Sequence, residues 1–366
     1  MASNLRFVFA GGGTGGHLFP ALAVAETLKH NHPESECIFL GRKDKIEGRI
    51  IPQTEFKFYA IISEGLSRTK MFRNIVVIIK FIYGFFQSLI VLAKYRPAAA
   101  FGTGAYISVA PILAAKVLGA KTILLESNSY PGIATKLLSN NADIVFISDE
   151  KTKTYLKNKN NTVLSGNPLR NSITAVSRDK ALNDFELNTG KKTVVFIGGS
   201  LGAKALSEFV VNNFKSLVNL NYQIVLQTGN NSYEKYDYLN SDNVRVVPFF
   251  DKVEQAYAMS DVLVSRAGAS AISEILLLGV PSILVPSPYV TENHQYHNAK
   301  SLEEQGAAVI AIESEIEETL LNTIISLLSD DSKRESLSLN AKILAKPDAA
   351  EFIAEKVYQL ALEERN

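Results

Sequence analysis

Short apolar runs alternate with longer amphipathic segments along most of the chain. Runs of strand length lie at residues 6–9, 37–40, 98–101, 122–125 and 144–147, and a second series lies at 194–197, 224–227, 244–247, 262–265 and 282–285. Continuous apolar strands separated by helices are typical of parallel sheets covered on both faces. The pattern therefore predicts an α/β protein built from two doubly wound, Rossmann-like domains.

A polar stretch divides the two series of strands. Residues 158–161 are rich in Asn and Lys, and Gly166-Asn167-Pro168 follows shortly after. We therefore expect a first domain at residues 1–165 and a second at residues 166–348. One more helix is predicted after Pro347, and we expect residues 349–366 to pack back on the first domain.

Both predicted domains begin with a strand, a glycine loop and a helix. The first loop reads Gly11-x-Gly13-x-x-Gly16, and the second reads Gly198-x-Ser200-x-Gly202. Glycines let the backbone turn sharply and approach a ligand, while the N–H groups at a helix start attract anions. Ligands of open α/β sheets bind at the carboxyl ends of the strands, so both loops are expected to face a shared cleft.

Taken alone, the motif of each glycine loop is compatible with a different class of enzyme. The first matches the dinucleotide fingerprint, and an NADP-dependent oxidoreductase could use Arg42 where an NAD enzyme has an acid. The second matches the nucleophile elbow of an α/β hydrolase, with Ser200 as nucleophile and Glu274 and His294 following in the hydrolase order. The elbow leaves the first glycine loop unexplained, so Ser200 fits better as a phosphate ligand. Both alternatives stay open at this point.

Composition narrows the class of protein. The chain has 366 residues, of which 46% are hydrophobic and 20% charged, as expected for two folded domains and not for a disordered chain. Its one cysteine, Cys37, excludes an intramolecular disulfide and a multi-cysteine zinc module, and no His-Glu-x-x-His motif occurs. We expect no metal site. The first residues lead directly into a strand without a secretory pattern, which favours a cytoplasmic protein.

The net charge of +1 hides an uneven distribution. No acidic residue occurs from Gly65 to Leu125, whereas eight basic residues do: Arg68, Lys70, Arg73, Lys80, Lys94, Arg96, Lys116 and Lys121. Residues 75–93 within this stretch carry Lys80 as their one charge and are long enough for a membrane span, but polar and glycine interruptions argue against one. Two interpretations remain: a largely buried helix, or a helix whose apolar face and basic neighbours contact an anionic bilayer.

Three stretches carry candidate chemistry. His17 stands at a helix start, where a neutral imidazole suits a general base, although a helix cap is the simpler explanation. Glu274 lies about one turn into a helix that begins with small residues, where it could hold the two hydroxyls of a ribose or only offset the helix dipole. Residues 292–299 present amides and imidazoles suited to sugar hydroxyls.

Seven motifs together resemble one family. They are residues 11–17 with Phe19-Pro20, 101–106, 126–128 with Pro131-Gly132, 166–170, 198–203, 265–274, and His294-Gln295 with Asn298-Ala299. In this order, over about the whole chain, they resemble the MurG-type glycosyltransferases. Members of that family add N-acetylglucosamine to undecaprenyl-pyrophosphoryl-N-acetylmuramoyl-pentapeptide.

The resemblance implies a GT-B architecture, two Rossmann-like domains facing a central cleft, with the acceptor bound mainly by the first domain and UDP-N-acetylglucosamine by the second. It implies inverting transfer to the C4 hydroxyl of lipid I, giving lipid II for peptidoglycan synthesis, with no cofactor. His17 would be the base, Gly104 and Tyr106 would lie on the acceptor side, and a purely binding protein would not need His17. The donor site would comprise Thr14, Gly15, Gly16, Asn128, Arg170, Ser200, Phe250, Ala269, Ser270, Ala271, Ile272, Ser273, Glu274 and Gln295.

Within that set, the resemblance assigns Glu274 to the ribose, Gln295 to sugar hydroxyls and Ser200 to the diphosphate, with the backbone of Phe250 beside the uracil. Departures from the family pattern are Leu201 and Ser127, each replacing a usual glutamine, and Thr103 and Ala105 in the acceptor-side turn. The implied location is peripheral, on the cytoplasmic side of the inner membrane. Expected partners are the two substrates, an anionic membrane surface and other cell-wall synthesis proteins, but no nucleic acid.

Overall fold

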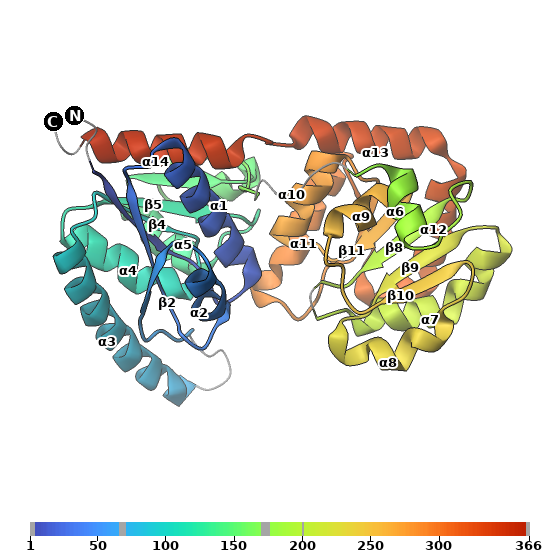
Figure 1. The fold of residues 1–366 in the computed structure, drawn as a ribbon, viewed down its shortest axis with the longest axis horizontal. Helices are drawn as coiled ribbons and strands as arrows, with labels where there is room; N and C mark the ends of the chain where they lie inside the picture. The colour runs from blue at the N-terminus through green and yellow to red at the C-terminus, as the bar shows by residue number, and fades with distance from the viewer. Residues whose placement is uncertain (1–3, 66–70, 170–175, 200, 364–366) are drawn as a thin grey trace. The chain divides into compact units, whose positions relative to one another are not determined.

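A computed structural model describes residues 4–65, 71–169, 176–199 and 201–363. The chain forms two compact units, a first domain of residues 1–171 with 346–366 and a second domain of residues 172–345. Each contains a wholly parallel sheet with helices on both faces, which confirms the predicted α/β class (Figure 1). The observed division lies a few residues from the expected boundaries at 165/166 and 348/349.

Seven strands form the sheet of the first domain, in the order β3-β2-β1-β4-β5-β6-β7. The central strands are buried on both faces, and Phe9 on β1 pairs in register with Phe39 and Phe101 on the neighbouring strands. The strand bounds are β1 Arg6–Ala10, β2 Glu36–Gly41, β3 Lys57–Ala60, β4 Ala99–Gly102, β5 Lys121–Glu126, β6 Ile144–Ile147 and β7 Thr162–Leu164.

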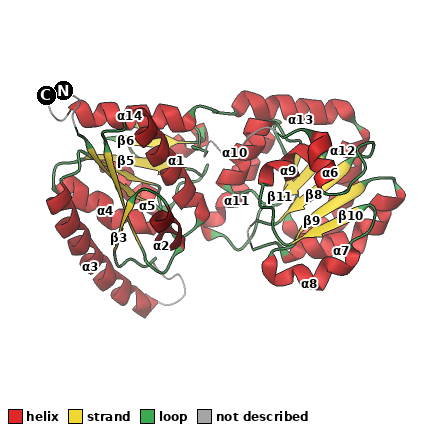
Figure 2. Ribbon diagram, in the orientation of Figure 1, coloured by secondary structure: helices red, strands yellow, loops and turns green. Residues whose placement is uncertain are grey.

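Helices cover this sheet on both sides (Figure 2). The C-terminal helix α14 belongs to the first domain and runs beside α1, where His32 stacks on Tyr358 with 3.4 Å between ring centroids. The helices are α1 Gly15–Asn31, α2 Ile46–Ile50, α3 Met71–Tyr95, α4 Tyr106–Val117, α5 Ile133–Leu138 and α14 Ala349–Glu363, with short 3-10 turns η1 Ile51–Gln53, η2 Ser139–Asn141 and η3 Glu150–Tyr155.

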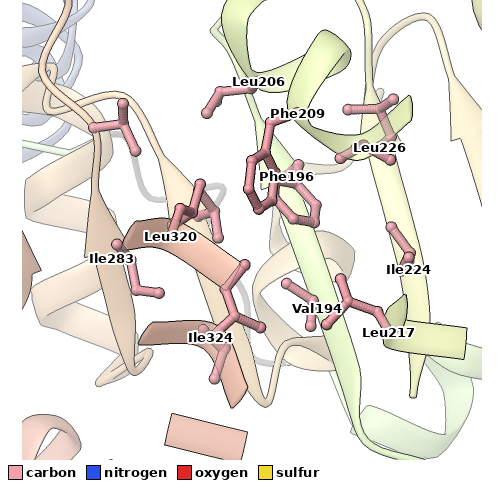
Figure 3. Close-up of a cluster of buried hydrophobic side chains, with 14 of the residues drawn as sticks. Val194, Phe196, Leu206, Phe209, Leu217, Ile224, Leu226, Ile283, Leu320 and Ile324 are labelled. Carbon is pink, nitrogen blue, oxygen red and sulfur yellow. The ribbon is translucent and has the colours of Figure 1, made fainter. Parts of the chain in front are cut away.

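The second domain repeats this plan with six parallel strands in the order β10-β9-β8-β11-β12-β13. Its largest core cluster lies between the sheet and the helices α7 and α12, with Phe196 against Phe209 and Leu320 (Figure 3). The strands are β8 Thr193–Ile197, β9 Gln223–Gln227, β10 Val244–Val247, β11 Val262–Ser265, β12 Ser282–Leu284 and β13 Val309–Ile310. The helices are α6 Arg178–Asp184, α7 Lys204–Asn219, α8 Tyr233–Tyr236, α9 Val253–Met259, α10 Ala269–Leu278, α11 His294–Glu304, α12 Ile316–Ser329 and α13 Asp331–Leu344, with 3-10 turns η4 Asn230–Ser232, η5 Asp237–Leu239, η6 Thr291–Asn293 and η7 Glu313–Glu315.

Every predicted strand coincides with an observed strand to within one or two residues, but three observed strands were not predicted. These are β3, β7 and β13, all at sheet edges. An edge strand has one strand neighbour and partly exposed faces, and β3 and β7 accordingly lack the continuous burial of the inner strands.

Helix α3 is exposed over much of its length, so its interpretation as a largely buried helix is wrong. From Phe72 to Tyr95 it is, among the described residues, the one helix long and apolar enough to cross a membrane, yet 22% of its most apolar window is buried. One face packs on α4, and Val77 and Leu92 are buried residues of α3. The opposite face bears an exposed apolar stripe: Phe72, Ile75, Ile79, Ile82, Phe86 and Ile90.

An acid just outside the basic stretch offsets part of its charge. Glu64 accepts hydrogen bonds from Arg73 at 2.6 Å and from Lys80 at 2.5 Å. Lys80 and Arg73 together lower the pKa of Glu64 to about 2, so the carboxylate is ionised at neutral pH. The stretch without acids is therefore less positive around α3 than its own sequence suggests. Arg68 and Lys70 lie outside the described residues.

Candidate active site

In the first domain, candidate residues gather where the strand order reverses between β1 and β4. The loops after these adjacent strands lie at the same edge of the sheet, which is where ligands of doubly wound folds bind. Nδ1 of His17 lies 2.7 Å from the carbonyl oxygen of Thr103. The fold thus brings the predicted base next to the turn that carries Gly104 and Tyr106.

The contact with Thr103 determines the tautomer of His17. A carbonyl oxygen can only accept a hydrogen bond, so Nδ1 carries the proton, and a neutral ring then has its lone pair on Nε2. The cap of α1 is Thr14, which makes no side-chain capping bond, and the ring of His17 is directed to a different loop. This geometry favours a chemical role for the imidazole over a helix cap. Thr14 and Gly16 are exposed beside it, and Gly15 is partly exposed.

A buried acid that the sequence did not single out lies under the first glycine loop. Glu47 is 1% exposed, and its carboxylate accepts hydrogen bonds from the backbone N–H of Gly13 at 2.8 Å and of Arg42 at 3.0 Å. The sequence signal was weak, because Glu47 is a single acid in a five-residue helix that no motif includes. The carboxylate ties the loop after β1 to the loop after β2.

A second buried carboxylate, Glu126, orders the loop that carries Asn128. It accepts bonds from the backbone N–H and the side-chain amide of Asn128, both at 3.0 Å, from Gly132 N at 3.0 Å and from Thr135 Oγ1 at 2.6 Å. Glu126 lies at the end of β5, in a motif that the sequence analysis quoted without giving this residue a role. It positions Asn128 at the same edge of the sheet as His17.

Gly104 and Tyr106, the two residues predicted to lie on the acceptor side, have different environments in the first domain. Gly104 has φ +69°, and a Cβ there would lie 2.6 Å from Thr135 Oγ1, so a larger residue would be strained and crowded. Tyr106 is half-buried beside Gly13, and burial raises the pKa of its hydroxyl, partly offset by Arg42. Its phenol therefore stays protonated at neutral pH.

In the second domain the strand order reverses between β8 and β11, and the second glycine loop follows β8. Gly199 has φ +86°, and a Cβ there would meet nothing within 4 Å, so the loop is open at that point. Gln227, buried at the end of β9, donates to the carbonyl of Gly199 at 2.8 Å. Leu201, one of the departures from the family pattern, is 85% exposed. Ser200 and Arg170 lie outside the described residues.

The stretch 269–274 after β11 forms the start of α10. Its cap, Gly268, has no side chain to bond the first amides, and a Cβ at this position would also meet nothing within 4 Å. The hydroxyl of Ser270 is buried and has no hydrogen-bond partner among the described residues. Free amides at a helix start favour an anion. Ala269 and Ala271 offer backbone only, Ile272 belongs to the core, and Ser273 bonds back to Ala269.

Glu274 is held inside the second domain by one tyrosine. Its carboxylate accepts a hydrogen bond of 2.5 Å from the hydroxyl of Tyr257. Burial raises the pKa of Glu274 and, with the neighbouring carboxylate, that of Tyr257. Glu274 is the sixth residue of α10, beyond the first turn, where dipole compensation falls off. The simpler explanation as a dipole-compensating residue therefore does not fit.

Two further predicted donor residues have distinct environments. Gln295 accepts a hydrogen bond from the backbone of Ser287 at 2.9 Å through Oε1, so its amide nitrogen is the group that can donate to a ligand. Phe250 is buried, with its ring 5.7 Å from that of Phe185. Its side chain belongs to the core, and only its backbone could face a base.

The geometry does not favour the two alternative enzymes, the α/β hydrolase and the NADP-dependent oxidoreductase, that the single glycine loops suggested. A hydrolase needs its acid and histidine paired, but Glu274 bonds Tyr257 while Nδ1 of His294 lies 2.7 Å from the carbonyl of Thr291. An NADP enzyme would need Arg42 for the 2′-phosphate, but that guanidinium pairs with Asp44 at 2.9 Å. Among the described residues, no three His, Cys, Asp or Glu side chains lie together as metal ligands would.

Two doubly wound domains with glycine loops at both switch points are the architecture of the GT-B glycosyltransferases. A crystal structure of Acinetobacter baumannii MurG superposes with a TM-score of 0.78 at 26% identity, covering 97% of this chain and 99% of that chain. The glycotransferase of kitacinnamycin shares the fold, with a TM-score of 0.73 at 17% identity over 97% of this chain and 100% of that one.

Sequence comparison identifies the family. The model of the glycosyltransferase family 28 N-terminal domain matches residues 7–147, and that of the family 28 C-terminal domain matches residues 193–353. The chain therefore belongs to glycosyltransferase family 28, which confirms the resemblance drawn from the motifs. Two relatives are named UDP-N-acetylglucosamine--N-acetylmuramyl-(pentapeptide) pyrophosphoryl-undecaprenol N-acetylglucosamine transferase. The relative from Caldicellulosiruptor saccharolyticus is 38% identical over 98% of both chains, and that from Bacillus licheniformis is 37% identical over 95% of this chain and 96% of its own.

Proposed function

We propose that this protein transfers N-acetylglucosamine from UDP-N-acetylglucosamine to lipid I, the undecaprenyl-pyrophosphoryl-linked N-acetylmuramoyl-pentapeptide, to give lipid II. The observation that carries the proposal is the open, uncapped start of α10 with the partly buried Glu274 one turn further on. A diphosphate next to a ribose diol has the chemistry that such a helix start and carboxylate recognise. The relatives' names supply the identity of the sugar and of the acceptor.

In the donor site, the amides of Ala269 through Ala271 and the unpartnered hydroxyl of Ser270 bind the diphosphate. Glu274 accepts hydrogen bonds from the ribose hydroxyls, and Tyr257 keeps its carboxylate in place. The amide nitrogen of Gln295 binds a sugar hydroxyl. Thr14, Gly15, Gly16, Asn128, Arg170, Ser200 and the backbone of Phe250 complete the proposed contacts.

The chemistry is a single displacement with inversion. The C4 hydroxyl of the acceptor attacks C1 of the sugar, the bond from C1 to the diphosphate oxygen breaks, and UDP leaves as an anion. Nε2 of His17 takes the hydroxyl proton, since Nδ1 is already protonated toward Thr103. Donors preorganised around the diphosphate stabilise the charge that develops on it.

The deciding experiment mixes the protein with UDP-N-acetylglucosamine and a soluble acceptor analogue and measures UDP release. Release that requires the acceptor is expected of the transferase. Release without acceptor would indicate a hydrolase, and binding seen by calorimetry without release would indicate a pure binding protein. Oxidation of NADPH with no transfer would indicate the oxidoreductase.

The proposal also includes a peripheral location on the cytoplasmic face of the inner membrane, because the acceptor is a lipid. The exposed stripe of α3, defined above by Phe72 to Ile90, can insert into the interface of the bilayer. Lys94 and Arg96 are exposed nearby and would add about 1 kcal/mol each on an anionic surface. Since Glu64 already pairs with Arg73 and Lys80, apolar contact is expected to contribute more than charge.

Vesicle flotation tests this location. The double variant Ile79→Ser and Phe86→Ser should lose most vesicle binding while donor affinity stays the same. Leu339→Ser with Ile343→Ser is the matched control, since these two exposed apolar residues lie on α13 of the second domain. Equal flotation of both double variants with wild type would remove α3 from the proposal.

A further inference from the structure

The first glycine loop already contains an anion supplied by the chain itself. In loops that bind phosphates, backbone N–H groups point at the ligand. Here the N–H of Gly13 points at Oε2 of Glu47, 2.8 Å away, and the N–H of Arg42 points at Oε1, 3.0 Å away. Glu47 is 1% exposed, so solvent does not satisfy this carboxylate.

Glu47 occupies space that is available because two neighbouring residues are glycines. A Cβ at Gly12 would lie 2.3 Å from Oε2 of Glu47, and a Cβ at Gly41 would lie 2.6 Å from its Cγ. Both contacts are far shorter than atoms allow, so the carboxylate occupies the volume that side chains at these two positions would need. The absence of side chains at Gly12 and Gly41 is therefore explained by Glu47 without any bound nucleotide.

The clamped loop leads directly to the candidate base. Gly13 lies four residues before His17, and the intervening Thr14 is the cap residue of α1 but makes no side-chain capping bond. Glu47 holds the backbone of the loop at Gly13, and the carbonyl of Thr103 holds the ring of His17. Errors of about 1 Å in the placement of a reacting group can cost about 100-fold in rate.

We infer that Glu47 is a positioning residue for transfer: an internal anion that takes the place of a phosphate in the first glycine loop and fixes the backbone from which His17 projects. The inference rests on the proposed function, because it assigns His17 to proton removal. It also explains why a loop with the dinucleotide fingerprint belongs to the acceptor domain.

Two substitutions separate the charge of Glu47 from its size. Glu47→Gln keeps the shape but turns an N–H₂ group toward one of two N–H donors, whereas Glu47→Asp is shorter and keeps two acceptor oxygens. If the anion matters, Glu47→Gln should lower kcat by about 10- to 100-fold, and Glu47→Asp should lose less. The affinity for UDP should stay within about twofold in both variants, because the contacts assigned to its ribose, diphosphate and uracil lie in the second domain.

A second readout does not depend on activity. Amide hydrogen exchange at residues 11–17 should become about tenfold faster in Glu47→Gln. Glu55→Gln, an exposed carboxyl of the same domain, is the matched control and should change neither exchange nor kcat.

Each outcome decides the matter. An equal or smaller loss in Glu47→Gln than in Glu47→Asp would mean that side-chain volume, not charge, is required, and would overturn the inference. Unchanged exchange of the loop, or UDP affinity falling together with kcat, would overturn it as well. If wild type shows no acceptor-dependent UDP release while exchange still accelerates in Glu47→Gln, the proposed function fails and the clamp on the loop stands.

Discussion

The two glycine loops have nearly the same sequence pattern but differ in what their backbone contacts. In the first, the N–H of Gly13 donates to the buried carboxylate of Glu47. In the second, no described residue of the loop donates to a carboxylate, and the contact from the end of β9 is the amide of Gln227 bonded to the carbonyl of Gly199. One loop is filled from within its own domain, and the other is open where Gly199 lies.

The difference teaches that a glycine motif specifies a backbone shape and not a ligand. The same shape serves as a rigid support when a side chain of the domain supplies the anion, and as a binding site when none does. The residue that decides between these outcomes is distant in sequence: Glu47 lies on α2, more than thirty residues after Gly13. We therefore expect damage to the first loop to affect turnover and damage around the second to affect the affinity for UDP.

The largest effect is expected from His17→Ala. Removing the base should lower kcat by about 100-fold or more, while the affinity for UDP measured by calorimetry stays unchanged. The variant His17→Gln keeps a polar group of similar reach and should not restore the rate, since an amide cannot take the proton. Near-normal turnover would return His17 to a structural role and break the assignment of the first loop to chemistry.

Next in size is Glu274→Ala in the second domain. Losing charge-assisted bonds to the ribose should weaken UDP binding by about 2 kcal/mol, roughly 30-fold. Glu254→Ala removes another carboxyl of the same domain and is the control. If calorimetry gives equal UDP affinities for wild type and a folded Glu274→Ala, the donor site lies elsewhere.

A pair of glycine substitutions tests the comparison itself. Gly12→Ala forces its Cβ against Oε2 of Glu47 and should destabilise the protein by about 1–3 kcal/mol, with a loss of turnover. Gly199→Ala meets open space, so only its positive φ should cost about 1 kcal/mol. Combining Gly12→Ala with Glu47→Ala should cost less than the sum of the two, as unfolding in urea can measure. Additive costs would show that the clash is not with Glu47.

The smallest effect is a gain of stability. Because burial raises the folded-state pKa of Glu274, the folded protein binds this proton more tightly than the unfolded chain. The ionised carboxylate thus destabilises the fold at pH values above its folded pKa, and the penalty disappears as the pH falls below the unfolded value. Glu274→Gln, which can still accept from Tyr257, should raise Tm by about 2 °C at pH 7.5 and by less near pH 4.5. An equal Tm difference at both pH values would contradict the pKa shift.

Local sequence was sufficient for the inner strands and for locating the motifs of the candidate site. Strands such as 144–147 and 262–265 are apolar along almost their whole length, because an inner strand of a parallel sheet is buried on both faces. The motifs around His17, Asn128 and Glu274 were visible because each begins where such a strand ends. The edge strands β3, β7 and β13 were not predicted from the sequence, because their assignment as strands depends on a neighbouring strand that the fold supplies.

Sequence by itself determined the class of the two domains, the places where the chain turns, and the family, because apolar period and glycine position are local properties. Only the tertiary structure decided what those turns contact. It put Glu47 under Gly13, Tyr257 against Glu274 and Glu64 between Arg73 and Lys80, and it left one face of α3 uncovered. These contacts join segments whose separation along the chain carries no signal, since a hydrogen bond or an ion pair depends on distance in space.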